Sequence, residues 1–215
     1  MKICRVSNSY PNDKRPGSGL VPFYLSKYSP EPSLYITRKL DSKKKVLPKH
    51  VALKEISYNE VPTPDNIRKS LQATESRKYY SKLWTLFRFA GTLRGLVFLL
   101  KSLPILISYK PEIVACHQSL TILHGIFSKY CLGSKFILHI HNNSEIVAMK
   151  NLWLLKVLVQ RADLIFCLTK NMGRELETFL PSMVGKIRYT STGVNPVLFR
   201  DLKKKRKNQL IAIGY

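Results

Sequence analysis

Short apolar runs rich in β-branched residues alternate along this chain with longer segments of helical periodicity. The apolar runs occupy residues 2–7, 33–37, 51–56, 112–117, 135–141, 163–168 and 186–190. Strands that are buried on both faces of a parallel sheet have this continuous apolar character, and they need crossover helices between them. The alternation therefore predicts an α/β fold, a Rossmann-like parallel sheet flanked by helices.

The helical segments between these runs carry their own start and stop signals. Helices are expected at residues 19–27, 65–103, 119–132, 150–161 and from about 170 to 179. Pro104 predicts the end of the long second region, which we expect to hold two helices, because proline removes a helical hydrogen bond. Gly133 is expected to end the third segment, and Thr169 or Asn171 to cap the last.

The composition limits the classes of protein that this chain can belong to. With 215 residues, of which 45% are hydrophobic, it can bury a core. The four cysteines are widely spaced, which predicts reduced core residues in a cytosolic protein and neither a disulfide framework nor a metal site. Residues 1–6 lack the apolar stretch of a secretory signal, and Lys101 and Pro104 interrupt residues 95–107, which fall short of the roughly 20 residues of a membrane span.

A formal net charge of +23 predicts attraction to nucleic acid, anionic lipid or phosphorylated substrates. Nucleic acid is disfavoured, because the basic residues are spread along the chain without a helix-turn-helix, RNP or zinc pattern. A salt-sensitive gel shift with DNA would revive the nucleic-acid interpretation. Basic and aromatic residues interleave at 77–89, and a helix there could lie in an anionic membrane interface. The alternative is an ordinary amphipathic helix that covers the sheet. Residues 43–45 and 203–207 are interpreted as solvated charges.

Five motifs follow one another over nearly the whole chain. Strand-like segments that end in histidine occupy Lys110 to His117 and Phe136 to His141, and Arg161 to Thr169 combines a strand with a helix cap. Gly193 to Phe199 reads Gly-Val-Asn-Pro-Val-Leu-Phe, and Leu210 to Gly214 is a short strand that ends in glycine. In this order they resemble the N-terminal domain of the GT-B glycosyltransferases of family four, the retaining enzymes that use nucleotide sugars.

The resemblance implies the division of the chain and its activity. Residues 1–200 would form the acceptor-side domain, and residues 201–215 a basic linker and the first strand of a truncated C-terminal donor-binding domain. The implied function is transfer of a sugar from a nucleotide sugar to a glycan or lipid-linked acceptor, in polysaccharide or cell-envelope biosynthesis. The expected location is the cytoplasm, with peripheral attachment to the inner face of the cell membrane, and no metal or other cofactor is expected.

Three residues depart from the family pattern. Glu112 and Asn195 each replace an aspartate, and Tyr215 stands where many relatives carry arginine. None of these changes affects the predicted fold, but Tyr215 would weaken a phosphate contact in the second domain.

The candidate site residues lie in loops that leave the carboxyl ends of the predicted strands, where open parallel sheets bind ligands. By resemblance, His141 faces the donor sugar as the catalytic candidate, with a pKa near neutrality. His139 is expected to pack behind it. The substrate-binding candidates are Gly17, Ser18, Gly19, His117, Asn142 and Asn143. The glycine loop would approach the acceptor and the donor diphosphate, or else be a mobile surface turn, and both asparagines are equally good turn residues.

No pair of carboxylates that could act as a glycosidase acid and base stands out among the 13 acidic residues. In a retaining transferase, the groups that stabilise the departing diphosphate would lie in the second domain. This segment alone is therefore expected to be inactive. The alternative function is a non-catalytic acceptor-binding or membrane-docking subunit of a split glycosyltransferase. A reading frame that continues past Tyr215 into a second domain with a Glu-x7-Glu element would decide between the two.

Overall fold

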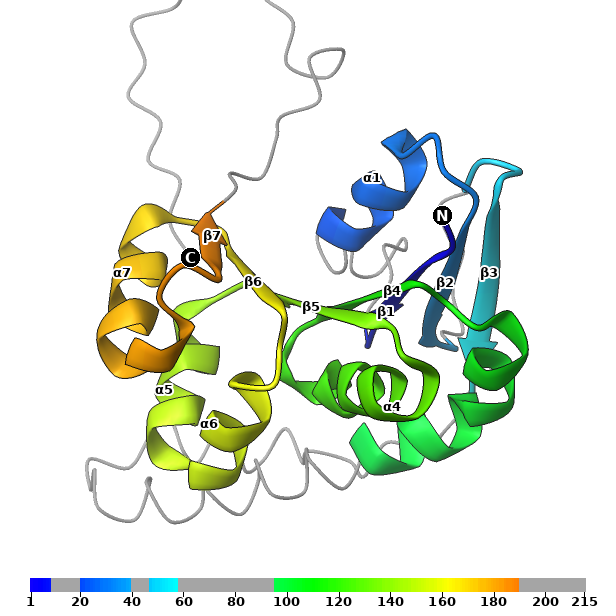
Figure 1. Ribbon diagram of the computed structural model, residues 1–215. Helices are drawn as coiled ribbons and strands as arrows, with labels where there is room; N and C mark the ends of the chain where they lie inside the picture. Colours follow the sequence, from blue (N-terminus) through cyan, green and yellow to red (C-terminus); the bar gives the residue numbers. More distant parts are fainter. Residues whose placement is uncertain (9–19, 40–46, 58–94, 190–215) are drawn as a thin grey trace, which may run out of the picture.

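Parallel strands form the centre of the molecule. The computed structural model describes residues 1–8, 20–39, 47–57 and 95–189. Within them lies a seven-stranded sheet of order β3-β2-β1-β4-β5-β6-β7, in which every neighbouring pair is parallel (Figure 1). Its strands are β1 (Ile3–Ser7), β2 (Ser33–Arg38), β3 (Val51–Ile56), β4 (Ile113–His117), β5 (Lys135–Ile140), β6 (Leu164–Cys167) and β7 (Ile187–Tyr189). The predicted α/β class is confirmed.

Helices cover both faces of this sheet. They are α1 (Leu20–Tyr28), a helix over residues 95–109, α4 (Ile122–Leu132), α5 (Asn143–Asn151), α6 (Trp153–Val159) and α7 (Lys170–Phe179), with 3-10 turns at Ser119–Thr121 and Pro181–Met183. In Figure 1, α1 lies on one side of the sheet, and α4, α5 and α6 lie on the other. None of the helices in the described part is long and apolar enough to cross a membrane.

The two faces of the sheet differ in chemistry. Alternate strand residues such as Val6, Cys116 and Leu138 are fully buried in the main apolar core with residues from α4 to α7. On the opposite face, Phe23 of α1 packs with Tyr35 and Val51 in a smaller cluster. Because successive side chains of a strand point to opposite faces, the remaining residues on the α1 face can be assigned from the strand register.

Several local predictions are confirmed. All seven of these strands occur where they were expected, with ends that differ by at most one residue. Gly133 ends α4 with φ 73°, and its N–H donates to the Ser128 carbonyl. Thr169 caps α7, because its Oγ1 accepts a hydrogen bond from the Met172 N–H at 3.2 Å.

Two helix predictions were wrong. The helix over 95–109 continues through Pro104 and ends at Lys110, which has φ 48°. Pro104 has no N–H to donate to the carbonyl of Leu100, four residues earlier in the helix. Both residues are exposed, so water can donate to that carbonyl instead. The expected helix at 150–161 is instead a pair, and α5 begins earlier, at Asn143. The apolar residues of 143–151 show only a weak helical periodicity, so the sequence did not predict this helix.

The cysteine prediction is corrected at one position. All four thiols are free, and Cys4, Cys116 and Cys167 are buried as expected. Burial raises the pKa of both Cys116 and Cys167 to about 12, so these thiols are protonated and inert at neutral pH. Cys131 is exposed on α4, because it lies on the face of that helix that turns away from the sheet.

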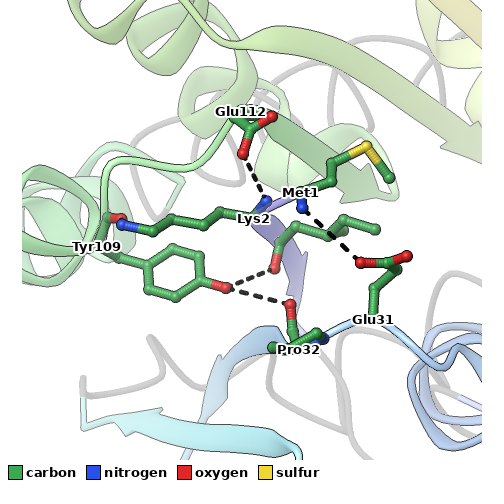
Figure 2. A network of polar contacts seen from close by, with 7 residues as sticks. Met1, Lys2, Glu31, Pro32, Tyr109 and Glu112 are labelled. Carbon is green, nitrogen blue, oxygen red and sulfur yellow. Dashed lines mark hydrogen bonds and ion pairs between the residues drawn. The ribbon is translucent and has the colours of Figure 1, made fainter.

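A polar network closes the amino-terminal edge of the central strands (Figure 2). The Lys2 backbone N–H donates to Glu112 Oε1 at 2.9 Å, and Tyr109 Oη donates to the carbonyls of Ile3 and Pro32 at 3.3 and 3.5 Å. Tyr109 thereby links the end of the 95–109 helix to β1 and to the start of β2. Glu112, which departs from the family pattern, thus has a structural role at the edge opposite the predicted site.

Asp163 of the Arg-Ala-Asp motif has a similar role at the same amino-terminal edge, where β6 begins beside β5. Its carboxylate accepts from the Phe136 N–H at 2.8 Å and from Lys129 Nζ at 2.6 Å. Burial alone would raise the pKa of Asp163, but these two hydrogen bonds bring it below its usual value. The motif therefore fixes β5, α4 and β6 to one another.

Some predictions fall outside the described residues. They concern Gly17 to Gly19, the basic residues 43–45 and 203–207, the basic and aromatic segment 77–89, and the motifs at 193–199 and 210–214.

The closest packing between helix and sheet gives a test of the fold. A Cβ atom added to Gly125 of α4 would lie 2.1 Å from two ring atoms of the fully buried Phe136. We expect Gly125→Ala to lower the free energy of unfolding by about 1–3 kcal/mol, because the ring has no room to retreat. The measurement is urea unfolding followed by circular dichroism.

Gly173→Ala in α7 is the matched control. Its added Cβ would meet Ile187 Cγ2 at an ordinary 3.7 Å, so the higher helix propensity of alanine should stabilise the protein by up to about 1 kcal/mol. Equal effects of the two substitutions would contradict this description of the α4 packing.

Candidate functional site

The order of the strands reverses between β1 and β4. From β1 the chain adds β2 and β3 on one side, and from β4 it adds β5, β6 and β7 on the other. Crossovers that leave two neighbouring strands in opposite directions open a crevice at the carboxyl ends of those strands. Ser7 and His117 are the register partners at that point, so the candidate site is located here.

A row of mainly polar residues crosses the sheet at this edge. Thr37 pairs with Ser7, Ser7 with His117, and His117 with His139. Alternation from Tyr35 places the row on the face covered by α1. Ser7, Thr37 and His117 are at most 1% exposed and His139 is 8% exposed, so the row is largely shielded from bulk water.

Three histidines gather at the end of this row. His117 Nδ1 lies 3.1 Å from His141 Nε2, which is a hydrogen bond between the two rings. The ring of His117 also stacks on that of His139, with centroids 4.3 Å apart, and His139 stacks on Phe166 at 5.1 Å. Two of the histidines named from the sequence, His117 and His141, are therefore brought into contact.

All three imidazoles are neutral at pH 7. Burial lowers the pKa of His141 to about 4. Burial, followed by the nearby His141 and Arg5, lowers the pKa of His139 to about 3. Burial is also the main cause of the lowered pKa of His117, to which His139, His141 and Arg5 add. The expected near-neutral pKa of His141 was wrong, because the sequence does not show how deeply this ring is buried. His141 can donate or accept a hydrogen bond, but it does not carry a positive charge at neutral pH.

Arg5 is a charged residue of the same face that sequence reasoning missed. It is 7% exposed, two residues before Ser7 on β1, and opposite Ala115 in the register. Burial lowers the pKa of its guanidinium. Within the described part of the chain, its Nη1 atom is buried without a hydrogen-bond partner, and no carboxylate forms an ion pair with Arg5. The available signal was the arginine inside the apolar run Ile-Cys-Arg-Val.

Gln118 follows the polar row in a strained conformation. Its φ of 78° and ψ of 156° fall in a region that is normally reserved for glycine. The Gln118 N–H donates to the His139 carbonyl at 3.1 Å, and its own carbonyl accepts from Thr121 Oγ1 at 3.0 Å. The strained turn therefore ties β4 to β5 next to the histidines.

Two asparagines named from the sequence lie beside the histidines on the surface. Asn142 and Asn143 are both exposed. Asn142 Oδ1 accepts from the Glu145 N–H at 3.2 Å, as an N-terminal helix cap does, and Asn143 begins α5. The interpretation as turn residues therefore describes their local geometry, while contact with substrate stays a prediction. The loop of Gly17, Ser18 and Gly19 lies outside the described residues.

The described residues offer no set of three or more histidine, cysteine, aspartate or glutamate side chains that could hold a metal ion. The chemistry available at this edge is hydrogen bonding by neutral imidazoles beside one buried positive charge. Such a site can bind and orient polar or anionic groups.

Comparison with solved structures defines the class of fold. Sucrose-phosphate synthase from Thermosynechococcus elongatus superimposes with a TM-score of 0.61 at 13% identity, over 92% of this chain and 49% of that one. HepE from Anabaena, solved in complex with UDP and glucose, gives 0.50 at 11% identity, over 93% of this chain and 46% of that one. The fold is thus that of one Rossmann-like half of a GT-B glycosyltransferase, and the chain spans about half the length of these proteins.

The family follows from the sequence model. Residues 62–198 match the model described as Glycosyltransferase Family 4, which covers more than half of the chain, so the chain belongs to this family. No curated protein matches the chain.

The buried histidines predict a steep acid sensitivity of the fold. Four of them, His117, His124, His139 and His141, have lowered pKa values. In the unfolded chain they titrate near 6.5, so below that pH the unfolded state binds more protons than the native state. Stability should therefore fall by roughly 1.4 kcal/mol per pH unit for each such histidine between about pH 6 and 5. Urea unfolding at several pH values measures this slope.

His124→Leu separates this effect from other titrations. His124 is fully buried in α4 against Phe98, and burial lowers its pKa to about 3. The variant should stay folded and lose roughly 1.4 kcal/mol per pH unit from the slope. An unchanged slope would show that His124 is not buried in its neutral form.

Proposed function

We propose that this chain is the acceptor-side half of a glycosyltransferase that transfers a sugar from a nucleotide sugar to a glycan or lipid-linked acceptor. The observation that carries the proposal is the contact of His117 and His141 at the carboxyl edge where the strand order reverses, in a chain of Glycosyltransferase Family 4. His141 is the residue that this proposal places at the transferred sugar.

A second domain would complete the active site. The chain covers 49% of sucrose-phosphate synthase and 46% of HepE, so the donor-binding half would be a further domain of the same chain or of a partner chain. The complex of HepE with UDP and glucose supports a nucleotide sugar as the donor. A formal charge of +23 is suited to a phosphorylated donor or acceptor.

The proposed chemistry is substitution at the anomeric carbon with retention of configuration. Positive charge develops on the sugar as the nucleotide diphosphate departs, and groups of the second domain would stabilise that diphosphate. The neutral imidazole of His141 would hydrogen-bond the sugar and hold its orientation. Partial burial strengthens this bond, because the surrounding dielectric is lower than that of water.

His141→Ala tests the proposal in the enzyme that contains both domains. We expect kcat to fall roughly 10- to 100-fold with little change in the melting temperature, because one hydrogen bond in a partly dry site contributes about 1–3 kcal/mol. Release of nucleotide diphosphate from a panel of nucleotide sugars, with and without acceptor, measures the rate.

His50→Ala is the matched histidine control. His50 is exposed just before β3, where Nε2 bonds to the Ser29 carbonyl at 2.8 Å, far along the sheet from the carboxyl edge. The turnover rate of the His50→Ala variant should equal that of the wild type. Wild-type turnover in His141→Ala would remove His141 from the site, and transfer that appears only when a separate partner chain is added would identify a split enzyme.

A further inference from the structure

The hydrogen bond between His117 and His141 requires a choice between two arrangements of protons. In one, His117 Nδ1–H donates to His141 Nε2, and both rings carry their proton on Nδ1. In the other, His141 Nε2–H donates to His117 Nδ1, and both rings carry it on Nε2. The 3.1 Å separation fits either, so the surroundings of His117 Nε2 must decide.

His117 Nε2 is buried without a hydrogen-bond partner among the described residues, and so is Nη1 of Arg5. Arg5 pairs with Ala115, two residues before His117 on β4, so the two side chains are diagonal neighbours on one face of the sheet. The positive charge of Arg5 is also close enough to lower the pKa of both His117 and His139.

The guanidinium can only donate hydrogen bonds. A bare His117 Nε2 would offer its lone pair to this neighbouring positive group, directly or through one water molecule. A protonated Nε2 would instead place two buried donors beside each other, with no described acceptor for either. The first arrangement is therefore favoured.

We propose that Arg5 and His117 are positioning residues that hold His141 in the Nδ1–H form, so that His141 offers an N–H donor to its ligand. The order of donation is Arg5 to His117 to His141. Stacking between His139 and Phe166 and between His139 and His117 holds the middle ring in place. Under the proposed function, on which this role rests, His141 donates to an oxygen of the sugar and does not act as a base.

The test is ¹⁵N NMR of the protein with labelled histidine rings at pH 7, because protonated and bare ring nitrogens differ widely in chemical shift. We expect His117 and His141 both to carry their proton on Nδ1 in the wild type. Protonation of His141 on Nε2 in the wild type would overturn the proposal whatever the variants show.

Arg5→Met removes the charge and should shift both rings toward the Nε2–H form. Arg5→Lys, which keeps the charge, should retain Nδ1–H. Unchanged His124 signals report an intact core, since His124 lies in α4 under the opposite face. If Arg5→Met does not fold, Arg5→Gln gives the same comparison without charge, and unaltered Nδ1–H signals in a folded neutral variant would overturn the role of Arg5.

Turnover in the two-domain enzyme links this arrangement to the reaction. Arg5→Met should lower kcat by a factor similar to that of His141→Ala, and Arg5→Lys should restore most of it. The two failures are distinguishable. Wild-type rates in His141→Ala would remove the proposed sugar contact while the NMR result still decides the tautomer, and an Nε2–H form of His141 would overturn the inference while leaving sugar transfer in place.

Discussion

The parallel pairing of β1 with β4 is the interaction on which the rest of the structure depends. It joins the two halves of the sheet, and it sets Ser7 beside His117 at the carboxyl edge. The register continues through β5, so His139 lies next to His117, and the chain then turns to place His141 against His117. A shift of one residue in this pairing would place Arg5 and His117 on opposite faces of the sheet, with one of them in the apolar core.

The two faces of the sheet have different roles. One face is apolar and stabilises the fold, and the other carries the polar residues of the candidate site. One face is sealed by apolar side chains from β1 to β7 and the helices below them. The other holds Arg5, Thr37 and His117 with buried polar atoms that lack partners among the described residues. Burying such atoms lowers stability, and the apolar face supplies the compensating burial. Loss of stability at a functional edge is the usual consequence of a site prepared for a ligand.

The alternation of apolar and helical segments was enough to predict the fold, because buried parallel strands leave a strong signal in sequence. The edge at which the histidines lie was predictable too, since the strands that end at His117 and His141 were recognised. Arg5 was missed because it stands within an apolar run, and only the register shows what it faces. The pKa of His141 was misjudged because desolvation depends on packing between distant segments. The helix end predicted at Pro104 was wrong because the lost hydrogen bond is tolerated where the residue is exposed, and exposure depends on the tertiary structure.

A crystal structure of this chain together with the proposed donor-binding domain and a nucleotide sugar tests the central claim most directly. The sugar should lie over the carboxyl ends of β1 and β4, with a ring nitrogen of His141 within hydrogen-bond distance of one of its oxygens. A sugar bound elsewhere, with His141 enclosed by protein on all sides, would contradict this account.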